Sequence, residues 1–324
     1  MQAWQVTSLG EPDEALRLVE VDRPVPGPGE VRVAVRAVGI NFADVLLCRG
    51  EYQVRPALPF SPGIELCGVV EQVGPDVTRV SVGQRVVASL IGALAQEVVV
   101  PQSAVHAAPD ELSDAEASVL TVSFHTAWFA LHRRAQLRAG ETVVVHAAAG
   151  GVGLAAVQLA AAAGARVVAV VGGAAKGDAA RRAGAHVVVD RGTEDLAGAL
   201  LAATDGRGAD VVVDPVGGDA YDASTRAVAL DGRIVLVGFA GGRVQEVRPG
   251  HVLVKNYSVL GLHWALYLQR RPDLVDQAHD ELLRLVAGGL RPVVADVVPW
   301  ERAPEALTRL AAGRTVGRLA VGLA

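Results

Sequence analysis

The chain of 324 residues has only two cysteines, Cys48 and Cys67, and they do not form a CxxC pair. Two cysteines are too few for a disulfide framework, which favours a reduced cytoplasmic protein. Aromatic residues make up only 4% of the chain, and the net charge at pH 7 is −5. This balance provides neither a basic field for a phosphate backbone nor interleaved basic and aromatic residues, so we expect no nucleic-acid partner.

The sequence also lacks recognisable targeting and membrane-spanning segments. Residues 1–18 have no basic start followed by an apolar run, so we expect no signal peptide. Residues 142–165 carry no charged residue and approach the length of a membrane span. However, this stretch begins with a β-branched run and contains Gly150, Gly151 and Gly153. We therefore expect no membrane association.

What remains is a globular composition, 51% hydrophobic, in a chain long enough for two domains. In residues 1–121, short segments with strand patterns are bounded by Gly, Pro or Asp, at 31–38, 68–73, 85–89 and 96–100. They predict a small β-barrel-like domain. Ser113 followed by Glu116 predicts an N-cap with a capping box, which opens one helix that extends to about Leu131.

Strand and helix patterns alternate from residue 141 onward. Apolar strands are expected at 142–146, 166–171, 187–190, 210–214 and 233–237, and helices at 153–163, 174–183, 194–204 and 219–229. Continuous apolar strands are typical of a parallel sheet covered on both faces. The α/β alternation predicts a doubly wound parallel sheet, a Rossmann domain, over residues 122–264. After a strand at 259–262 come helices at 273–287 and 303–311 and a strand at 317–322, and we expect residues 265–324 to return to the first domain.

The most informative stretch is the apolar strand that turns through glycines into an Ala-rich helix. Residues without side chains let backbone amides approach a pyrophosphate, and the helix N-terminus favours its charge. Ala148 stands where a strict GxGxxG motif has its first glycine, so a merely structural tight turn is the alternative. The strand–turn–helix context favours dinucleotide binding by Ala149, Gly150, Gly151, Val152 and Gly153.

The end of the second strand indicates which dinucleotide is bound. NAD sites place an acidic residue there for the ribose 2′-hydroxyl, whereas this strand ends at Gly172 and Gly173. Lys176, one of two lysines beside 28 arginines, and Arg191 are candidates to bind a 2′-phosphate. A solvated basic surface is the alternative interpretation, and NADPH is the predicted cofactor.

Four segments together resemble the medium-chain dehydrogenases/reductases, and most of all the quinone oxidoreductases, which include zeta-crystallin. They are residues 39–44, 62–65, 147–153 and 231–235, in the family's order along the whole chain. The resemblance implies that the first domain is GroES-like. It also implies a homodimer, in which the apolar segments 252–254 and 259–260 would join two sheets edge to edge.

The resemblance further implies that no metal is bound. Asn41 stands where zinc-dependent relatives have a cysteine, Ile64 where they have a histidine, and residues 120–125 offer no cysteine. A catalytic zinc needs about three protein ligands. A site built from Cys48, Cys67 and a histidine is the alternative, but ordinary core packing of the two cysteines is favoured.

Several site residues follow from the resemblance alone. Asn41, Asp44 and Thr126 are expected near the nicotinamide, with Asn41 donating a hydrogen bond to a substrate oxygen and Asp44 either orienting groups or capping a loop. Tyr52 matches a proton donor of related enoyl-thioester reductases, or it lines an apolar pocket. Cofactor contacts are further expected from Val216, Gly238, Phe239, Leu262, His263, Trp264 and Arg318.

Without a metal, the substrate must accept hydride readily, as quinones and other activated α,β-unsaturated carbonyls do. The sequence therefore predicts an NADPH-dependent reductase of a small quinone or enone. An enoyl-thioester reductase and a non-catalytic NADPH-binding protein are the alternatives.

Overall fold

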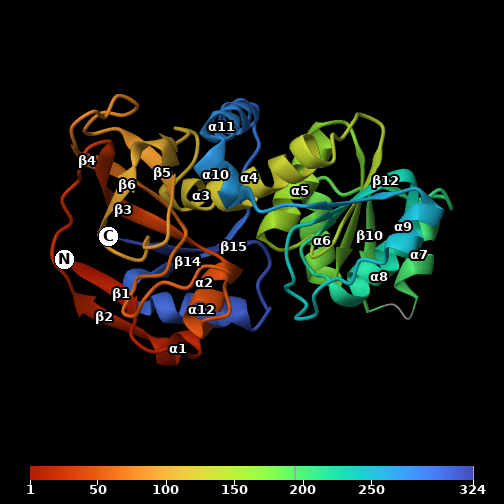
Figure 1. Ribbon diagram of the computed structural model, residues 1–324, viewed down its shortest axis with the longest axis horizontal. Helices are drawn as coiled ribbons and strands as arrows, with labels where there is room; N and C mark the ends of the chain where they lie inside the picture. The colour runs from red at the N-terminus through yellow and green to blue at the C-terminus, as the bar shows by residue number, and fades with distance from the viewer. Residues whose placement is uncertain (193–194, 324) are drawn as a thin grey trace. The chain divides into compact units, whose positions relative to one another are not determined.

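The computed structural model of the chain describes residues 1–192 and 195–323, and the chain divides into two units. Unit 1 comprises Met1–Val122 and Tyr267–Ala324, and unit 2 comprises Ser123–Leu266. The C-terminal segment joins unit 1 through its last strand, which pairs antiparallel with a strand of the N-terminal segment (Figure 1).

Unit 1 is built on a seven-stranded sheet with an additional two-stranded hairpin. The hairpin consists of β1 (Gln2–Val6) and β2 (Leu16–Glu20). The sheet contains β3 (Glu30–Ile40), β4 (Glu65–Val73), β5 (Arg85–Ser89), β6 (Glu97–Pro101), β7 (Val105–Ala107), β14 (Val294–Pro299) and β15 (Arg318–Gly322). The long strand β3 lies at its centre, paired with β4, β6 and β15. All four strands predicted in this part of the chain are present.

The helices of unit 1 are mostly short. They are α1 (Pro12–Ala15), α2 (Phe42–Arg49), α3 (Asp114–Ser118), α11 (Pro272–Ala287) and α12 (Ala303–Ala311), with single 3₁₀ turns at Gln102–Ala104 and Trp300–Arg302. The helices α4 (Thr121–Trp128) and α10 (Trp264–Arg270) span the two boundaries between the units.

The prediction of one helix from Ser113 to Leu131 is wrong. The capping box of Ser113 and Glu116 is present, but α3 ends at Ser118 and α4 begins at Thr121, followed by a π-helical segment at Phe129–Arg134. At the break, the amides of Val119 and Leu120 donate to carbonyls only three residues back. The buried carboxylate of Glu65 accepts the Val122 amide, so a tertiary contact satisfies the start of the second helix.

Unit 2 is a six-stranded parallel sheet with the order β10-β9-β8-β11-β12-β13. The strands are β8 (Thr142–Val145), β9 (Arg166–Val171), β10 (Val187–Asp190), β11 (Ala209–Asp214), β12 (Val228–Leu236) and β13 (Ser258–Gly261). Their connections contain α5 (Gly151–Ala162), α6 (Ala174–Arg182), α7 (Leu196–Ala203), α8 (Gly218–Ala227) and α9 (Pro249–Lys255). The predicted doubly wound sheet is confirmed, and its strand order reverses between β8 and β11, where such sheets bind ligands.

Some predicted bounds in unit 2 differ from the structure. The helix predicted at 219–229 ends at Ala227, because buried Val228 already pairs with Ala209 and starts β12 five residues before the predicted strand. Residues 252–254, expected to join two sheets, lie in helix α9. The predicted helix start at Glu194 lies outside the described residues.

Burial explains the apolar runs. Val143, Val144 and Val145 of β8 are completely buried, as expected for a strand with helices over both faces. The uncharged stretch at 142–165 divides into β8, a turn and α5. None of the described helices combines the length and the apolar character that crossing a membrane requires.

Candidate active site

The glycine turn between β8 and α5 is closely packed. Gly150 is extended at the helix N-cap, and its amide donates to the Ala147 carbonyl over 2.8 Å. A Cβ atom on Gly153 would lie 2.1 Å from the oxygen of Ala147, so no side chain fits there. Ala148, where the strict motif has glycine, is fully buried and donates its amide to Val170. The turn therefore presents the first-turn amides of α5 at the carboxyl end of β8, an arrangement suited to a pyrophosphate.

The end of β9 forms a second part of the candidate cofactor site. Gly172 lies under Arg191, since a Cβ atom on this glycine would be 2.9 Å from the arginine Nε. Lys176 lies in the first turn of α6. The structure thus brings Gly172 and Arg191 together, and their contact with a 2′-phosphate stays a prediction.

Sequence reasoning missed Asp190 at this position. Its carboxylate accepts from the Gly173 amide at 3.2 Å and from the Gly192 amide at 2.9 Å. An acidic residue of an NAD site is expected at the end of β9, whereas this aspartate reaches the same place from the neighbouring strand β10. Only the pairing of β9 with β10 could have revealed it.

The loops after β11 and β12 are joined by a buried aspartate and a buried glutamine. Asp214 accepts from the Val216 and Gly217 amides, both at 2.9 Å, and from Gln245 Nε2 at 3.1 Å. Gln245 Nε2 also donates to the Gly238 carbonyl. Within the described part of the chain, Gln245 Oε1 is buried without a hydrogen-bond partner. Two predicted cofactor residues, Val216 and Gly238, are thus brought together, and Gln245 had no sequence signal.

The remaining predicted cofactor residues of unit 2 lie on two segments. Thr126 is buried on α4, and its neighbour His125 has its ring 5.5 Å from the ring of Trp264. The amide of Leu262 donates to Leu236 at the end of β12. Phe239 is half exposed, and His263 follows Leu262 directly. His146, just after β8, is buried with Nε2 at 2.7 Å from Ser224 Oγ, and burial lowers its pKa.

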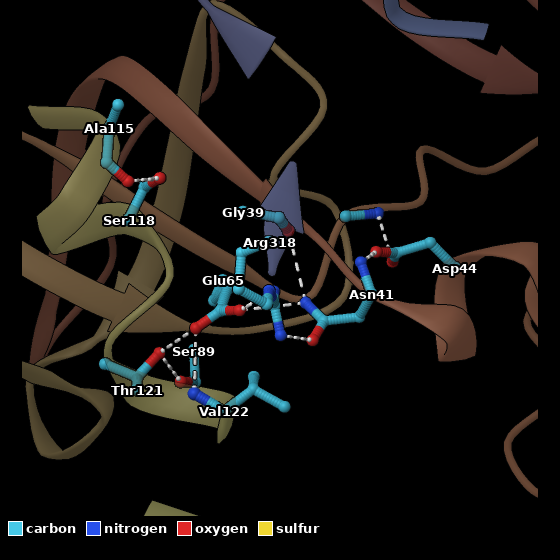
Figure 2. Close-up of polar contacts among 11 residues, drawn as sticks. Gly39, Asn41, Asp44, Glu65, Ser89, Ala115, Ser118, Thr121, Val122 and Arg318 are labelled. Atoms are coloured by element: carbon cyan, nitrogen blue, oxygen red, sulfur yellow. Dashed lines mark hydrogen bonds and ion pairs between the residues drawn. The ribbon is translucent and has the colours of Figure 1, made fainter. Parts of the chain in front are cut away.

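In unit 1, Asp44 stabilises the start of α2. Its carboxylate accepts from the amide of the N-cap residue Asn41 at 2.8 Å (Figure 2). It also accepts from the Gly63 amide at 3.0 Å. The side chain is fully buried, and desolvation raises the pKa of Asp44 to about 7. These contacts are those of the loop-capping alternative.

The side chains of Asn41 and Arg318 contact each other within unit 1. Asn41 Nδ2 donates to the Gly39 carbonyl at 3.1 Å and to Glu65 Oε1 at 2.9 Å, while its Oδ1 accepts from Arg318 Nη1 at 2.7 Å. Arg318 also forms an ion pair with Glu65. Both amide hydrogens of Asn41 are therefore engaged inside the protein. The contacts of Asn41 and Arg318 with substrate and cofactor stay predictions.

Glu65 was quoted in the sequence only as part of a family segment, yet it organises this network. It is fully buried, and its Oε2 accepts from Thr121 Oγ1 at 2.9 Å and from the Val122 amide at 2.8 Å. Figure 2 shows the carboxylate between Arg318 and Asn41 on one side and Thr121 and Val122 on the other. A single glutamate at the start of an apolar strand was the only available signal.

Tyr52 is half buried after α2, and burial together with the negative charge of Asp44 raises the pKa of its phenol. Cys48 and Cys67 are both fully buried, and desolvation raises the pKa of each thiol to about 12. Among residues 1–192 and 195–323, no three or more His, Cys, Asp and Glu side chains form a group that could hold a metal ion. The absence of a metal stays a prediction.

Known proteins with this sequence pattern are dehydrogenases and quinone oxidoreductases. Residues 27–110 match the alcohol dehydrogenase GroES-like domain, and residues 151–281 match the zinc-binding dehydrogenase family. Quinone oxidoreductase-like protein 2 of Mus musculus is 37% identical over 99% of this chain and 95% of its own length. Quinone oxidoreductase of Pseudomonas aeruginosa is 35% identical over 97% of both chains.

Solved structures agree with these relatives. A mycobacterial protein in complex with NADPH has a TM-score of 0.92 and 34% identity, with 100% of both chains covered. The CurK enoyl reductase has a TM-score of 0.90 and 28% identity, and covers 100% of this chain and 99% of its own. The chain therefore belongs to the medium-chain dehydrogenase/reductase family, among the quinone oxidoreductases, and is an oxidoreductase with a nicotinamide cofactor.

Proposed function

We propose that this protein transfers hydride from NADPH to quinones or other activated α,β-unsaturated carbonyls without a metal ion. The observation that carries the proposal is the turn at Gly150–Gly153, where the 2.1 Å approach of a Gly153 Cβ atom to Ala147 leaves room for backbone only. This turn lies in a chain related over its whole length to quinone oxidoreductases.

The residues that would hold NADPH extend over the carboxyl ends of the parallel strands. The first turn of α5 is suited to the pyrophosphate, and Arg191 over Gly172, with Lys176 on α6, is suited to a 2′-phosphate. The buried acceptor Gln245 Oε1, close to Val216 and Gly238, is an unsatisfied group that a bound carboxamide could satisfy. When bound, NADPH supplies the hydride, and the protein supplies orientation and hydrogen bonds.

The substrate class follows from the chemistry that the chain provides. Without a metal to polarise a carbonyl, the acceptor must spread the developing negative charge by conjugation. Tyr52 is the proposed proton donor, because a phenol is protonated at neutral pH and can deliver a proton in a closed site. In unit 2, Thr126 and residues 262–264 are proposed to contact the nicotinamide. In unit 1, Asn41 and Asp44 are the residues proposed to act at the nicotinamide end.

The second candidate is reduction of enoyl thioesters. The likeness to the CurK enoyl reductase and the presence of Tyr52 favour it. A thioester carrier has phosphates that need basic residues, and Arg49 is one candidate. However, Arg49 forms a two-point ion pair with Glu11, with both distances 2.9 Å, which leaves it less suited to that role.

The deciding experiment follows NADPH absorbance after addition of a benzoquinone and, separately, of crotonyl-CoA. We expect rapid oxidation with the benzoquinone, slower oxidation with crotonyl-CoA, and the same rates after exhaustive chelation. Faster turnover of crotonyl-CoA would favour the enoyl-thioester reductase. No oxidation with either acceptor would leave a non-catalytic NADPH-binding protein, and activity lost on chelation and restored by zinc would overturn the metal-free chemistry.

We also propose that two copies of this chain pair through the β13 edge of unit 2. The strand β13 ends the parallel sheet, so one side of its backbone has no strand partner among residues 1–192 and 195–323. Beside it, Leu253 and Val254 on α9 are each 75% exposed, and a cavity of about 560 Å³ lies between α9 and β13, lined by Val252, Leu253 and Val259 among others. Exposed apolar residues beside a free strand edge are suited to a second copy.

A further inference from the structure

We infer that Glu65 is a positioning residue for hydride transfer: its buried carboxylate fixes Asn41, Arg318 and the first turn of α4 in one arrangement. This inference rests on the proposed hydride transfer from NADPH to a quinone or enone, and it gives a role to a residue that the sequence did not single out.

The two carboxylate oxygens of Glu65 contact different parts of the chain. Oε1 accepts from Asn41 Nδ2 at 2.9 Å and pairs with the Arg318 guanidinium, at the start of α2 and the start of β15. Oε2 accepts from Thr121 Oγ1 at 2.9 Å and from the Val122 amide at 2.8 Å, at the start of α4. One side chain therefore joins three helix or strand ends that are far apart in sequence (Figure 2).

All four partners of Glu65 are hydrogen-bond donors. Ser89 Oγ donates to Thr121 Oγ1 at 2.9 Å, so the hydroxyl hydrogen of Thr121 is left to donate to Glu65. An ionised carboxylate offers acceptors only, so it suits four donors at once. A glutamine would place its own N–H groups against two of these donors. The site therefore requires a carboxylate in particular, and not simply a polar side chain of this length.

Burial makes this arrangement rigid. Glu65 is completely buried and Arg318 is 7% exposed, so neither charge can turn to water if its partner moves. Breaking a buried ion pair leaves an uncompensated charge, which is strongly unfavourable. A carboxylate is also favoured at the positive N-terminal end of a helix.

The helix that Glu65 holds is the one that carries Thr126. Val122, the last residue of unit 1, lies in the first turn of α4, and Thr126 follows four residues later on the same helix. A displaced first turn would displace Thr126, and loss of the Oε1 contacts would release Asn41. Catalysis is sensitive to small errors in the placement of such groups, whereas the affinity for NADPH through its phosphates is not.

The test compares Glu65→Gln with Glu97→Gln. Glu97 is a matched control, because it is 7% exposed, lies in the same sheet and has its ion pairs with Arg23 and with Arg32, the latter at 3.1 Å. Four quantities are measured: the temperature of thermal unfolding, the Kd of NADPH, the single-turnover rate with a benzoquinone, and the steady-state KM of the benzoquinone. We expect Glu65→Gln to lower the single-turnover rate about tenfold or more, with the Kd of NADPH rising much less because the groups proposed for its phosphates lie in unit 2. Glu97→Gln should lower stability alone.

Equal kinetic effects of the two substitutions would overturn the inference. If Glu65→Gln does not fold, Glu65→Asp replaces it, because it keeps the charge but is one methylene too short to reach both groups of donors. A wild-type rate in Glu65→Asp would likewise overturn the inference.

Amide hydrogen exchange of residues 121–126 separates this outcome from failure of the proposed function. If the wild-type protein oxidises no NADPH with either acceptor, the proposed function fails. Faster exchange in Glu65→Gln than in Glu97→Gln would then still support the inference that Glu65 fixes the first turn of α4. Equal exchange in the two variants would contradict that inference.

Discussion

The residues proposed to distinguish NADPH from NADH lie at the ends of β9 and β10 and on α6. Arg191 covers Gly172, where a Cβ atom would lie 2.9 Å from the arginine Nε, and Lys176 is on the first turn of α6. Asp190 is bound to the Gly173 and Gly192 amides, so its carboxylate is held by backbone at the same place. A 2′-phosphate would therefore meet two cations and one anchored carboxylate.

Replacing Lys176 and Arg191 together by alanine is expected to weaken NADPH binding about 100-fold or more, because each charge-assisted hydrogen bond contributes roughly 1.5–3 kcal/mol. NADH, which lacks the phosphate, should bind almost as before. Titration of both cofactors with the purified variant measures this difference. Arg181→Ala is the control, since Arg181 lies on the same helix in an ion pair with Asp178 at 2.9 Å. Equal losses for NADPH and NADH would remove the assigned role.

Among the elements, helix α11 of unit 1 packs against β7 through two neighbouring histidine rings. His106 on β7 and His279 on α11 have ring centroids 4.7 Å apart. His106 Nε2 lies 3.1 Å from Asp276, which Arg79 also contacts, and His279 Nε2 lies 2.9 Å from the Ala107 carbonyl. Burial is the main cause that lowers the pKa of His106 to about 4 and also lowers the pKa of His279.

This histidine pair predicts acid sensitivity. The unfolded chain protonates His106 near pH 6.5, whereas the folded chain does so only near pH 4, so the unfolded state binds more protons between these values. The stabilisation is complete above pH 6.5 and is lost as the pH falls towards 4, by roughly 3 kcal/mol for this group. Urea unfolding at pH 7, 6 and 5 measures the fall. A His106→Gln variant should show a shallower fall, and an unchanged slope would contradict the assignment.

The break between α3 and α4 shows how an element can depend on a distant residue. Ser113 and Glu116 form the predicted capping box, so the helix start is encoded locally. The end of this helix at Ser118 is not encoded locally, because neither glycine nor proline lies between Ser113 and Leu131. The Glu65 carboxylate accepts from the Val122 amide at the start of the new helix, and Glu65 lies on a strand 57 residues earlier.

At the scale of the whole molecule, the exposed apolar side chains beside β13 predict a dimer in solution. Replacing Leu253 and Val254 together by aspartate should give monomers, because it places charges in the proposed interface. The monomers should stay folded, because both side chains are 75% exposed and contribute little to the hydrophobic core. Light scattering across a concentration series measures the mass. Val25→Asp, at an equally exposed valine in unit 1, is the control and should stay dimeric. A wild-type protein that is monomeric at all concentrations would refute the dimer.

The sequence by itself determined the architecture of unit 2 and the place of its glycine turn. Runs such as Val143–Val145 and the adjacent glycines are local signals, because burial on both faces and close backbone approach restrict which residues can occur there. The strands of unit 1 were predictable for a similar reason, since β-branched alternation reports on one buried face.

Only the tertiary structure decided how the polar side chains are paired. Asn41, Glu65, Thr121 and Arg318 come from four separate segments, and nothing local in any of them shows which donors a buried carboxylate will meet. The same holds for Asp190, Gln245 and the pair of His106 and His279. The physical reason is that a buried charge or hydrogen-bonding group must be satisfied by whatever the folded chain brings within about 3 Å, and that set is fixed by topology and strand register.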